Sequence, residues 1–251
     1  MPSSSPANMA DLIEMFNELP GPDGEALSQA EKREPQLTKP PGALGRLEEI
    51  SAWMSAWQGS HPPRLKKPAC VVFAGNHGVA ARGVSAFPAE VTAQMVANFK
   101  HGGAAINQLC KTFGADLSVV ALDLDHPTAD MCQAAAMSED EFIAAFNQGM
   151  ASVKDGIDLL AVGEMGIANT TAAAAIAHAL FGGEAQDWTG PGTGVAGQAL
   201  NHKASVVGLA VDFHKPGIDN PLDALRRLGG RELAAMAGAV LSARFKRVPV
   251  L

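Results

Sequence analysis

The stretch LLAVGEMGIANTT, residues 159–171, indicates the fold class more clearly than any other part of the chain. Four apolar residues lead into a segment with two glycines, Gly163 and Gly166, and then into an alanine-rich run. A short apolar run followed at once by a helical pattern is typical of a parallel strand that is covered on both faces and leads into a crossover helix. The stretch therefore predicts a strand-to-helix junction of an α/β protein.

Apolar runs and amphipathic runs alternate along the whole chain from residue 66 onward. The connections are too long for hairpins but suit crossover helices, so we expect an α/β fold with a Rossmann-like parallel sheet flanked by helices. The expected strands are 69–74, 117–124, 157–162, 205–211 and 248–251. The expected helices are 88–100, 103–113, 138–153, 170–180 and 231–246.

The beginning of the chain has a different pattern. Helical stretches are expected at 9–19 and at about 43–57, with a Gly/Pro turn between them at 20–24. We therefore expect residues 1–62 to form a small N-terminal helical subdomain and residues 63–251 to form the parallel α/β domain. A strand at 248–251 would have nothing after it, so we expect this domain to be truncated at its C-terminal end.

Composition excludes several classes of protein. The 251 residues are 47% hydrophobic and 18% charged, as in a soluble globular chain. A net charge of −7 argues against nucleic acid as a partner. The sequence contains neither a secretory signal nor an apolar stretch long enough for a membrane span, so we expect a cytoplasmic protein. Three well-separated cysteines, at positions 70, 110 and 132, predict no disulfide and no zinc site.

Two glycine-containing junctions are candidate phosphate sites. In the first, Asn169, Thr170 and Thr171 begin the expected helix, where free N–H groups and the helix dipole suit an anion. An ordinary capped helix explains this pattern equally well. The second cluster, 190–194, precedes Lys203 and could form an anion-binding nest, although a flexible turn explains it better when it is considered alone. Two such loops at successive strand ends favour one shared phosphate site.

Two titratable residues lie near these junctions. His77 follows the first strand and is a candidate acid or base, but a hydrogen-bonded structural role explains a single histidine better. Glu164 lies between a strand end and the first phosphate loop, where burial would raise its pKa toward a catalytic range. A carboxylate that accepts backbone N–H bonds explains Glu164 equally well.

Several ordered motifs, taken together, resemble one family. They are KPPGALGRLE (39–48), FAGNHGV (73–79), GVSAFPAEVTAQM (83–95), GGAAIN (102–107), GEMGIANTT (163–171), 192–194 and 229–238. The family is nicotinate-nucleotide:dimethylbenzimidazole phosphoribosyltransferase, a pentosyltransferase of cobalamin biosynthesis, and the resemblance extends from about residue 36 to residue 251. It implies transfer of the phosphoribosyl group of nicotinate mononucleotide to 5,6-dimethylbenzimidazole, which gives α-ribazole 5′-phosphate and nicotinate.

The resemblance also implies roles for residues of this chain. Glu164 is the catalytic candidate, and no metal or other cofactor is required. The family is generally homodimeric, so we expect a homodimer here. Phosphate contacts fall on the two glycine-containing loops and Lys203, and base contacts fall on the segment 85–94. The substrate-binding candidates are Ser85, Phe87, Gln94, Met165, Gly166, Ile167, Asn169, Thr170, Thr171, Gly192, Thr193, Gly194 and Lys203.

The chain also departs from the family pattern. Asn76 replaces a common aspartate, Ala168 a usual glycine and Pro191 a frequent arginine. If position 168 needs a positive φ, the alanine would strain the loop. The family's usual catalytic glutamate lies beyond the strand that matches 248–251, and nothing in this sequence matches it. The alternative to an enzyme is therefore a truncated homologue that binds the nucleotide or a benzimidazole without turnover, or one part of a split enzyme.

Overall fold

A computed structural model describes residues 5–251, and its centre is a parallel sheet of three strands in the order β2-β1-β3. The strands are β1 (Pro68–Ala74), β2 (Asp116–Ala121) and β3 (Leu159–Met165). β1 lies in the middle, with Phe73 opposite Val120 on one side and opposite Glu164 on the other. The predicted Rossmann-like parallel sheet flanked by helices is confirmed.

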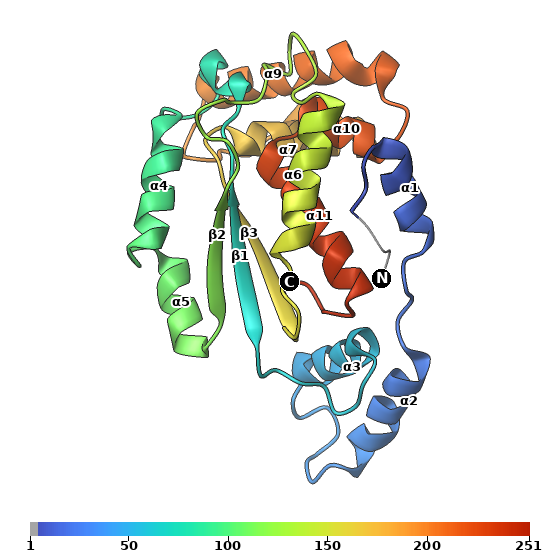
Figure 1. The fold of residues 1–251 in the computed structure, drawn as a ribbon. Coiled ribbons are helices and arrows are strands. Elements are labelled where there is room, and N and C mark those ends of the chain that lie inside the picture. Colours follow the sequence, from blue (N-terminus) through green and yellow to red (C-terminus); the bar gives the residue numbers. More distant parts are fainter. Residues whose placement is uncertain (1–4) are drawn as a thin grey trace.

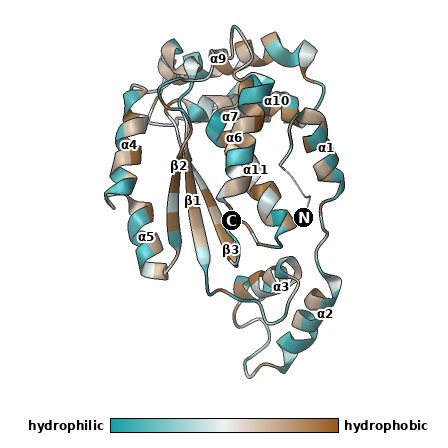
Figure 2. Cartoon of the chain, in the orientation of Figure 1, coloured by the Kyte–Doolittle hydropathy of each residue, from teal (hydrophilic) through white to brown (hydrophobic). Residues whose placement is uncertain are grey.

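Helices cover both faces of the sheet (Figure 1). One face packs against α4 (Glu90–Lys100) and α5 (Ala105–Phe113), and the other packs against α6 (Glu139–Ser152) and α11 (Arg231–Phe245). Figure 2 shows apolar residues concentrated along the strands between these layers. The remaining helices are α1 (Met9–Asn17), α2 (Gly24–Arg33), α3 (Arg46–Gln58), α7 (Asn169–Phe181), α8 (Ala185–Trp188), α9 (Gln198–His214) and α10 (Pro221–Leu228).

The layer of α6 and α11 is unusually close-packed, because a glycine of each helix faces the backbone of the other. A Cβ at Gly149 would collide with the carbonyl of Ala235, and a Cβ at Gly238 would collide with the carbonyl of Phe146. Alanines of α11 also face the sheet, so a small-residue surface brings this helix close to β1 and β3. The first turn of α11 is thereby fixed beside the carboxyl ends of these strands.

The N-terminal residues divide between two places in the fold. α1 packs through Leu12 and Met15 against Phe142 and Phe146 of α6. α2 and α3 instead pack on each other near the amino ends of the strands (Figure 1). The division of the chain at residue 62 stays a prediction.

Two expected strands are wrong or incomplete. Residues 205–211 belong to α9, whose buried positions include Lys203, Val207, Ala210 and His214, a spacing of three to four residues that is helical. The run at 205–211 lies within this longer helix and includes the exposed Leu209 as well as buried residues, but in isolation its apolar composition resembles a strand. At 248–251 the chain lies parallel to β3 but forms only an isolated bridge, between Val250 and Leu160.

The other expected elements follow the sequence patterns within a few residues, but α8 and α10 were not predicted, and neither was α2. Its buried residues are two alanines, Ala26 and Ala30, so few large apolar side chains mark this helix in the sequence. Its start is nevertheless well defined, because the Asp23 side chain accepts a hydrogen bond from the Ala26 amide. No helix within residues 5–251 has the length and apolarity needed to cross a membrane.

Candidate functional site

The candidate site lies at the carboxyl ends of β1 and β3, below the N-terminal part of α9. In open parallel sheets this edge is where ligands bind, because the loops after the strands and the helix N-termini converge there. Three segments meet at this edge: the loop after β1, the junction of β3 with α7, and the glycine cluster that precedes α9. The ribbon shows α9 passing over this end of the sheet, opposite α2 and α3 (Figure 1).

Lys203 joins the two predicted phosphate loops. Its side chain is 1% exposed, and its Nζ donates to Thr170 Oγ1 at 2.7 Å and to the carbonyl of Gly190 at 2.9 Å. An ammonium group has three N–H donors, so one donor is left after these two bonds. Burial lowers the pKa of Lys203 because it disfavours the charged form. The partnership that the sequence predicted between Lys203 and both loops is present in the fold.

Gly192 closes this cluster from the side of the glycine loop. Its φ is +53°, and a Cβ at this position would lie 2.7 Å from Thr170 Oγ1 and 2.8 Å from Lys203 Nζ. A side chain would therefore be strained and would displace the lysine. Pro191, at the neighbouring position, accepts hydrogen bonds from the amides of Gly194 and Val195 and fixes the turn.

Ser85 and Thr193 connect the predicted base-binding segment to the same glycine loop. Their hydroxyl oxygens lie 3.0 Å apart, and Thr193 Oγ1 also accepts from the Ala86 amide. The side chain of Phe87 is 52% exposed next to this contact. Gln94 is exposed on α4. The fold thus brings the expected base segment and phosphate loop together through Ser85 and Thr193.

The junction of β3 with α7 contains a residue in a strained backbone conformation, and position 168 does have a positive φ. Ala168, at the start of α7, has φ 72° and ψ 4°, the left-handed conformation that favours glycine. Its methyl side chain cannot accept a hydrogen bond from the first turn of the helix. Beside it the hydroxyl of Thr171 is buried and has no hydrogen-bond partner in the described part of the chain.

Two predicted site residues at this junction point their side chains into the protein. Met165 packs in the cluster between β1 and α5, and Ile167 is 2% exposed. The amide of Ile167 donates to the hydroxyl of Thr92 on α4, a buried residue that sequence reasoning did not single out. Any ligand contact of Met165 or Ile167 would use their backbone. Thr92 lies within the quoted 83–95 motif, but a buried threonine on a helix gives no local signal of such a role.

Glu164 is exposed at the end of β3 and accepts a hydrogen bond from the Asn169 side chain. Partial desolvation by the surrounding protein and the neighbouring Glu232 carboxylate raise its pKa, while Asn169 and His77 act in the opposite direction. The net shift is upward. A carboxylate with a raised pKa accepts a proton more readily, which is the property a general base needs.

His77 and Glu232 form a buried pair behind Glu164. His77 Nε2 lies 2.7 Å from Glu232 Oε1, and the two side chains are 1% and 0% exposed. Glu232 was missed from the sequence, because it lies in the first turn of a helix, 155 positions after His77. Next to His77, Asn76 donates to the carbonyl of Leu124 while its own side-chain oxygen has no partner among residues 5–251.

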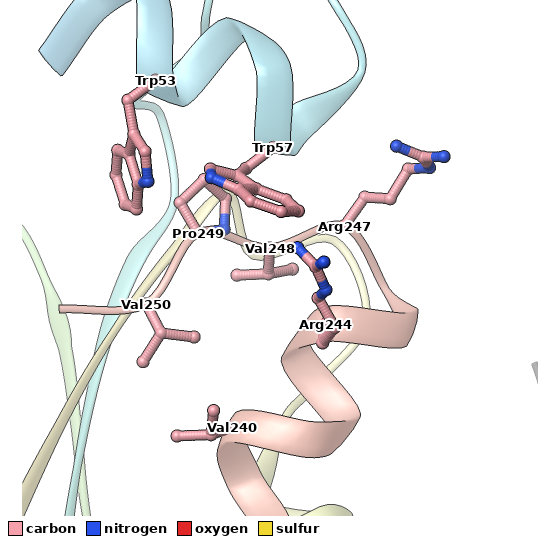
Figure 3. A pocket seen from close by; sticks show the side chains of 8 residues that line it. All are labelled: Trp53, Trp57, Val240, Arg244, Arg247, Val248, Pro249 and Val250. Atoms are coloured by element: carbon pink, nitrogen blue, oxygen red, sulfur yellow. The ribbon is translucent and has the colours of Figure 1, made fainter. Parts of the chain in front are cut away.

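An apolar hollow of different character lies at the amino end of the sheet (Figure 3). It has a volume of about 290 Å³ and is bounded by α3, the end of α11 and the C-terminal segment. Trp53 and Trp57 face Val248, Pro249 and Val250 across it, and the Arg244 guanidinium lies 3.6 Å from the centre of the Trp57 ring. None of the predicted substrate residues lines this hollow.

Comparison with known proteins gives consistent matches. A family model described as phosphoribosyltransferase matches residues 19–251. The nicotinate-nucleotide–dimethylbenzimidazole phosphoribosyltransferases of Cereibacter sphaeroides (strain ATCC 17025) and Ruegeria pomeroyi are each 57% identical over 244 residues, 97% of this chain and 72% of theirs. The enzyme of that name from Rhizobium etli (strain CIAT 652) is 54% identical over 96% of this chain and 71% of its own.

A solved structure agrees with the sequence matches. CobT from Thermus thermophilus superimposes with a TM-score of 0.83 at 40% identity, covering 90% of this chain and 73% of that one. The matched region includes every element that forms the candidate site, since the family model begins at residue 19 and continues to residue 251. The chain therefore belongs to the phosphoribosyltransferase family of these relatives.

Proposed function

We propose that the chain transfers the phosphoribosyl group of nicotinate mononucleotide to 5,6-dimethylbenzimidazole, giving α-ribazole 5′-phosphate and nicotinate for cobalamin biosynthesis. The observation that carries this proposal is the cluster of Lys203, Thr170 and Gly192 at the end of β3, joined by Thr193 to Ser85. The names of the relatives, 54–57% identical to this chain, support the same reaction.

The phosphate of the nucleotide would bind at the junction of β3 with α7. The remaining Lys203 donor, the Thr170 hydroxyl and the positive end of the α7 dipole all favour a phosphate there. Gly194, whose φ is +111°, is exposed and leaves its backbone accessible beside this position. Holding the phosphate fixes the anomeric carbon relative to the incoming base, which accelerates the reaction through positioning.

The chemical step forms one C–N bond and breaks another. A ring nitrogen of the benzimidazole attacks C1′, the bond from C1′ to the nicotinate nitrogen breaks with its electron pair going to nicotinate, and the configuration at C1′ inverts. The product cation then loses the proton of the other ring nitrogen. We assign Glu164 as the acceptor of this proton, because its raised pKa and exposed position at the site suit that role.

The direct test is turnover by the purified 251-residue protein. Nicotinate mononucleotide and 5,6-dimethylbenzimidazole are mixed with the protein, and chromatography follows nicotinate and α-ribazole phosphate. The proposal predicts product formation, and a fall in kcat of about 100-fold or more in Glu164→Gln, as for loss of a general base. The control is Glu49→Gln, an exposed glutamate of α3 paired with Arg46, which should leave kcat unchanged. Absence of product with the unaltered chain would contradict the proposal.

Three further properties are part of this proposal. The partners are the nucleotide and the benzimidazole, the chain works in the cytoplasm, and it forms a homodimer as the resemblance implies. The negative net charge supports small-molecule substrates over nucleic acid. Analytical ultracentrifugation tests the dimer, and a single monomeric species at micromolar concentration would contradict it.

A further inference from the structure

The paired side chains of His77 and Glu232 are more deeply buried than a simple structural contact requires. Removing a carboxylate from water is costly unless it is paired and fully hydrogen-bonded. Glu232 Oε1 has its partner in His77, but Oε2 is buried and has none among residues 5–251. A stabilising ion pair would be expected to satisfy both oxygens, so the unpartnered atom calls for a different explanation.

The pair occupies a space that three glycines keep open. A Cβ at Gly75 or at Gly230 would collide with the Glu232 carboxylate. A Cβ at Gly166 would lie 3.3 Å from His77 Nε2. Gly75 follows β1, Gly166 follows β3 and Gly230 precedes α11. The three segments that form the inner side of the site therefore meet at the pair of His77 and Glu232.

Glu164 lies immediately above this space. It precedes Gly166 by two residues, and the alternation along β3 places its side chain on the α11 face of the sheet, as for Leu160 and Val162. Glu232 from α11 and His77 from the loop after β1 are the ionisable groups that act on it, and the neutral Asn169 faces it from α7. Glu232 raises the pKa of Glu164, whereas His77 lowers it.

We propose that His77 and Glu232 are positioning residues for the transfer reaction: His77 holds the buried Glu232 side chain at the inner side of the site, and the pair sets the electrostatic environment of Glu164. The Glu232 carboxylate favours the protonated form of Glu164 and thereby assists it in accepting the azole proton. The proposal rests on the proposed function only for the identity of that proton.

The test is a direct titration of the Glu164 carboxyl without substrates. Glutamate is labelled with ¹³C at Cδ, and the Glu164 signal is assigned by its absence in Glu164→Gln. In Glu232→Gln the midpoint should fall by about half to one pH unit, because the carboxylate that raises it is gone. In His77→Gln it should rise, because the opposing positive charge is gone and a buried carboxylate remains.

A matched control separates this effect from general damage. Glu141→Gln removes another carboxylate that is paired with the first turn of α11, through Arg231, and it should leave the Glu164 midpoint unchanged. If the pair were purely structural, Glu232→Gln and His77→Gln would both lower the melting temperature, but they would not move the Glu164 midpoint in opposite directions. That result would overturn the proposal.

If a single variant does not fold, the double variant His77→Gln/Glu232→Gln keeps a neutral hydrogen-bonded pair. Its midpoint should also fall, and an unchanged midpoint would overturn the proposal.

Turnover adds a second readout. The acidic limb of the kcat profile should move with the Glu164 midpoint in Glu232→Gln, while the KM for nicotinate mononucleotide stays within about twofold because the phosphate contacts are intact. An unshifted acidic limb with a shifted midpoint would refute the link between the pair and the reaction. Absence of turnover in the unaltered chain would contradict the proposed function, and the titration would still decide the role of the pair.

Discussion

The two ends of the sheet are built from the same strands but bury very different groups. At the carboxyl end Lys203, His77 and Glu232 are each at most 2% exposed, and glycines give them room. At the amino end two tryptophans and a proline border an apolar hollow, and the Arg244 guanidinium lies over the Trp57 ring (Figure 3). Burial of ionisable groups is costly, so their concentration at one end supports the assignment of the candidate site to that end.

The largest expected difference between the two ends of the sheet is in nucleotide affinity, after removal of one positive charge at each end. Lys203→Met should weaken binding of nicotinate mononucleotide by about 10- to 100-fold, the usual effect of losing a charge-assisted hydrogen bond. Arg244→Met removes a cation of the amino end and should leave the affinity unchanged. Isothermal titration calorimetry measures both, and equal losses in the two variants would mean that the ends do not differ in this respect.

A smaller effect is expected at Gly192. Gly192→Ala adds a Cβ that meets Thr170 and Lys203 in a strained backbone conformation, so nucleotide affinity should fall about tenfold, for a cost of about 1–2 kcal/mol. Gly190→Ala is the matched control, because a Cβ there meets nothing within 4 Å. An affinity in Gly192→Ala equal to that of the control would remove Gly192 from the site.

Removing the Glu164 carboxylate and removing the Glu48 carboxylate should change the melting temperature in opposite directions, and both changes should depend on pH. Glu164 has a raised pKa, whereas Lys39 holds the pKa of Glu48 below its usual range near α3. A raised carboxyl pKa in the folded state means that ionisation opposes folding. Glu164→Gln should therefore raise the melting temperature at neutral pH, and this gain should disappear as the pH falls below the ordinary glutamate range. Glu48→Gln should lower the melting temperature at neutral pH, and this loss should disappear in acid.

The smallest expected effects concern one backbone conformation at each end. Ala168 adopts φ 72° at the site, and Gly59 adopts φ 65° after α3. Ala168→Gly should stabilise the protein by about 1 kcal/mol, and Gly59→Ala should destabilise it by about 1 kcal/mol. Urea unfolding measures both. A loss of stability in Ala168→Gly would show that burial of its methyl group outweighs the strain.

Local patterns in the sequence predicted the sheet and one half of the site. The run 159–171 carries its own strand, loop and helix start, so Glu164 and Thr170 could be singled out without a structure, and the resemblance pointed to possible strain at Ala168. Lys203 could be proposed because the resemblance placed it with the phosphate loops. The helix at 205–211 was misread, because its apolar run is short and its helical spacing is visible only over the whole of α9.

Long-range contacts could not be predicted in this way. Glu232 reaches His77 across 155 positions from α11, a helix that packs closely on α6 at Gly149 and Gly238. Thr92 reaches the amide of Ile167 from a helix on the opposite face. Neither contact leaves a signal in the spacing of residues along the chain.

A crystal structure of the chain with nicotinate mononucleotide tests the location of the site most directly. The phosphate should lie within hydrogen-bond distance of Lys203 Nζ and Thr170 Oγ1, with the ribose directed toward Glu164. The amino end offers a competing cationic hollow of about 490 Å³, lined by Arg64, Lys66, Lys67 and Arg247. A phosphate bound among those residues, with Lys203 unchanged, would contradict the assignment of the site to the carboxyl end of the sheet.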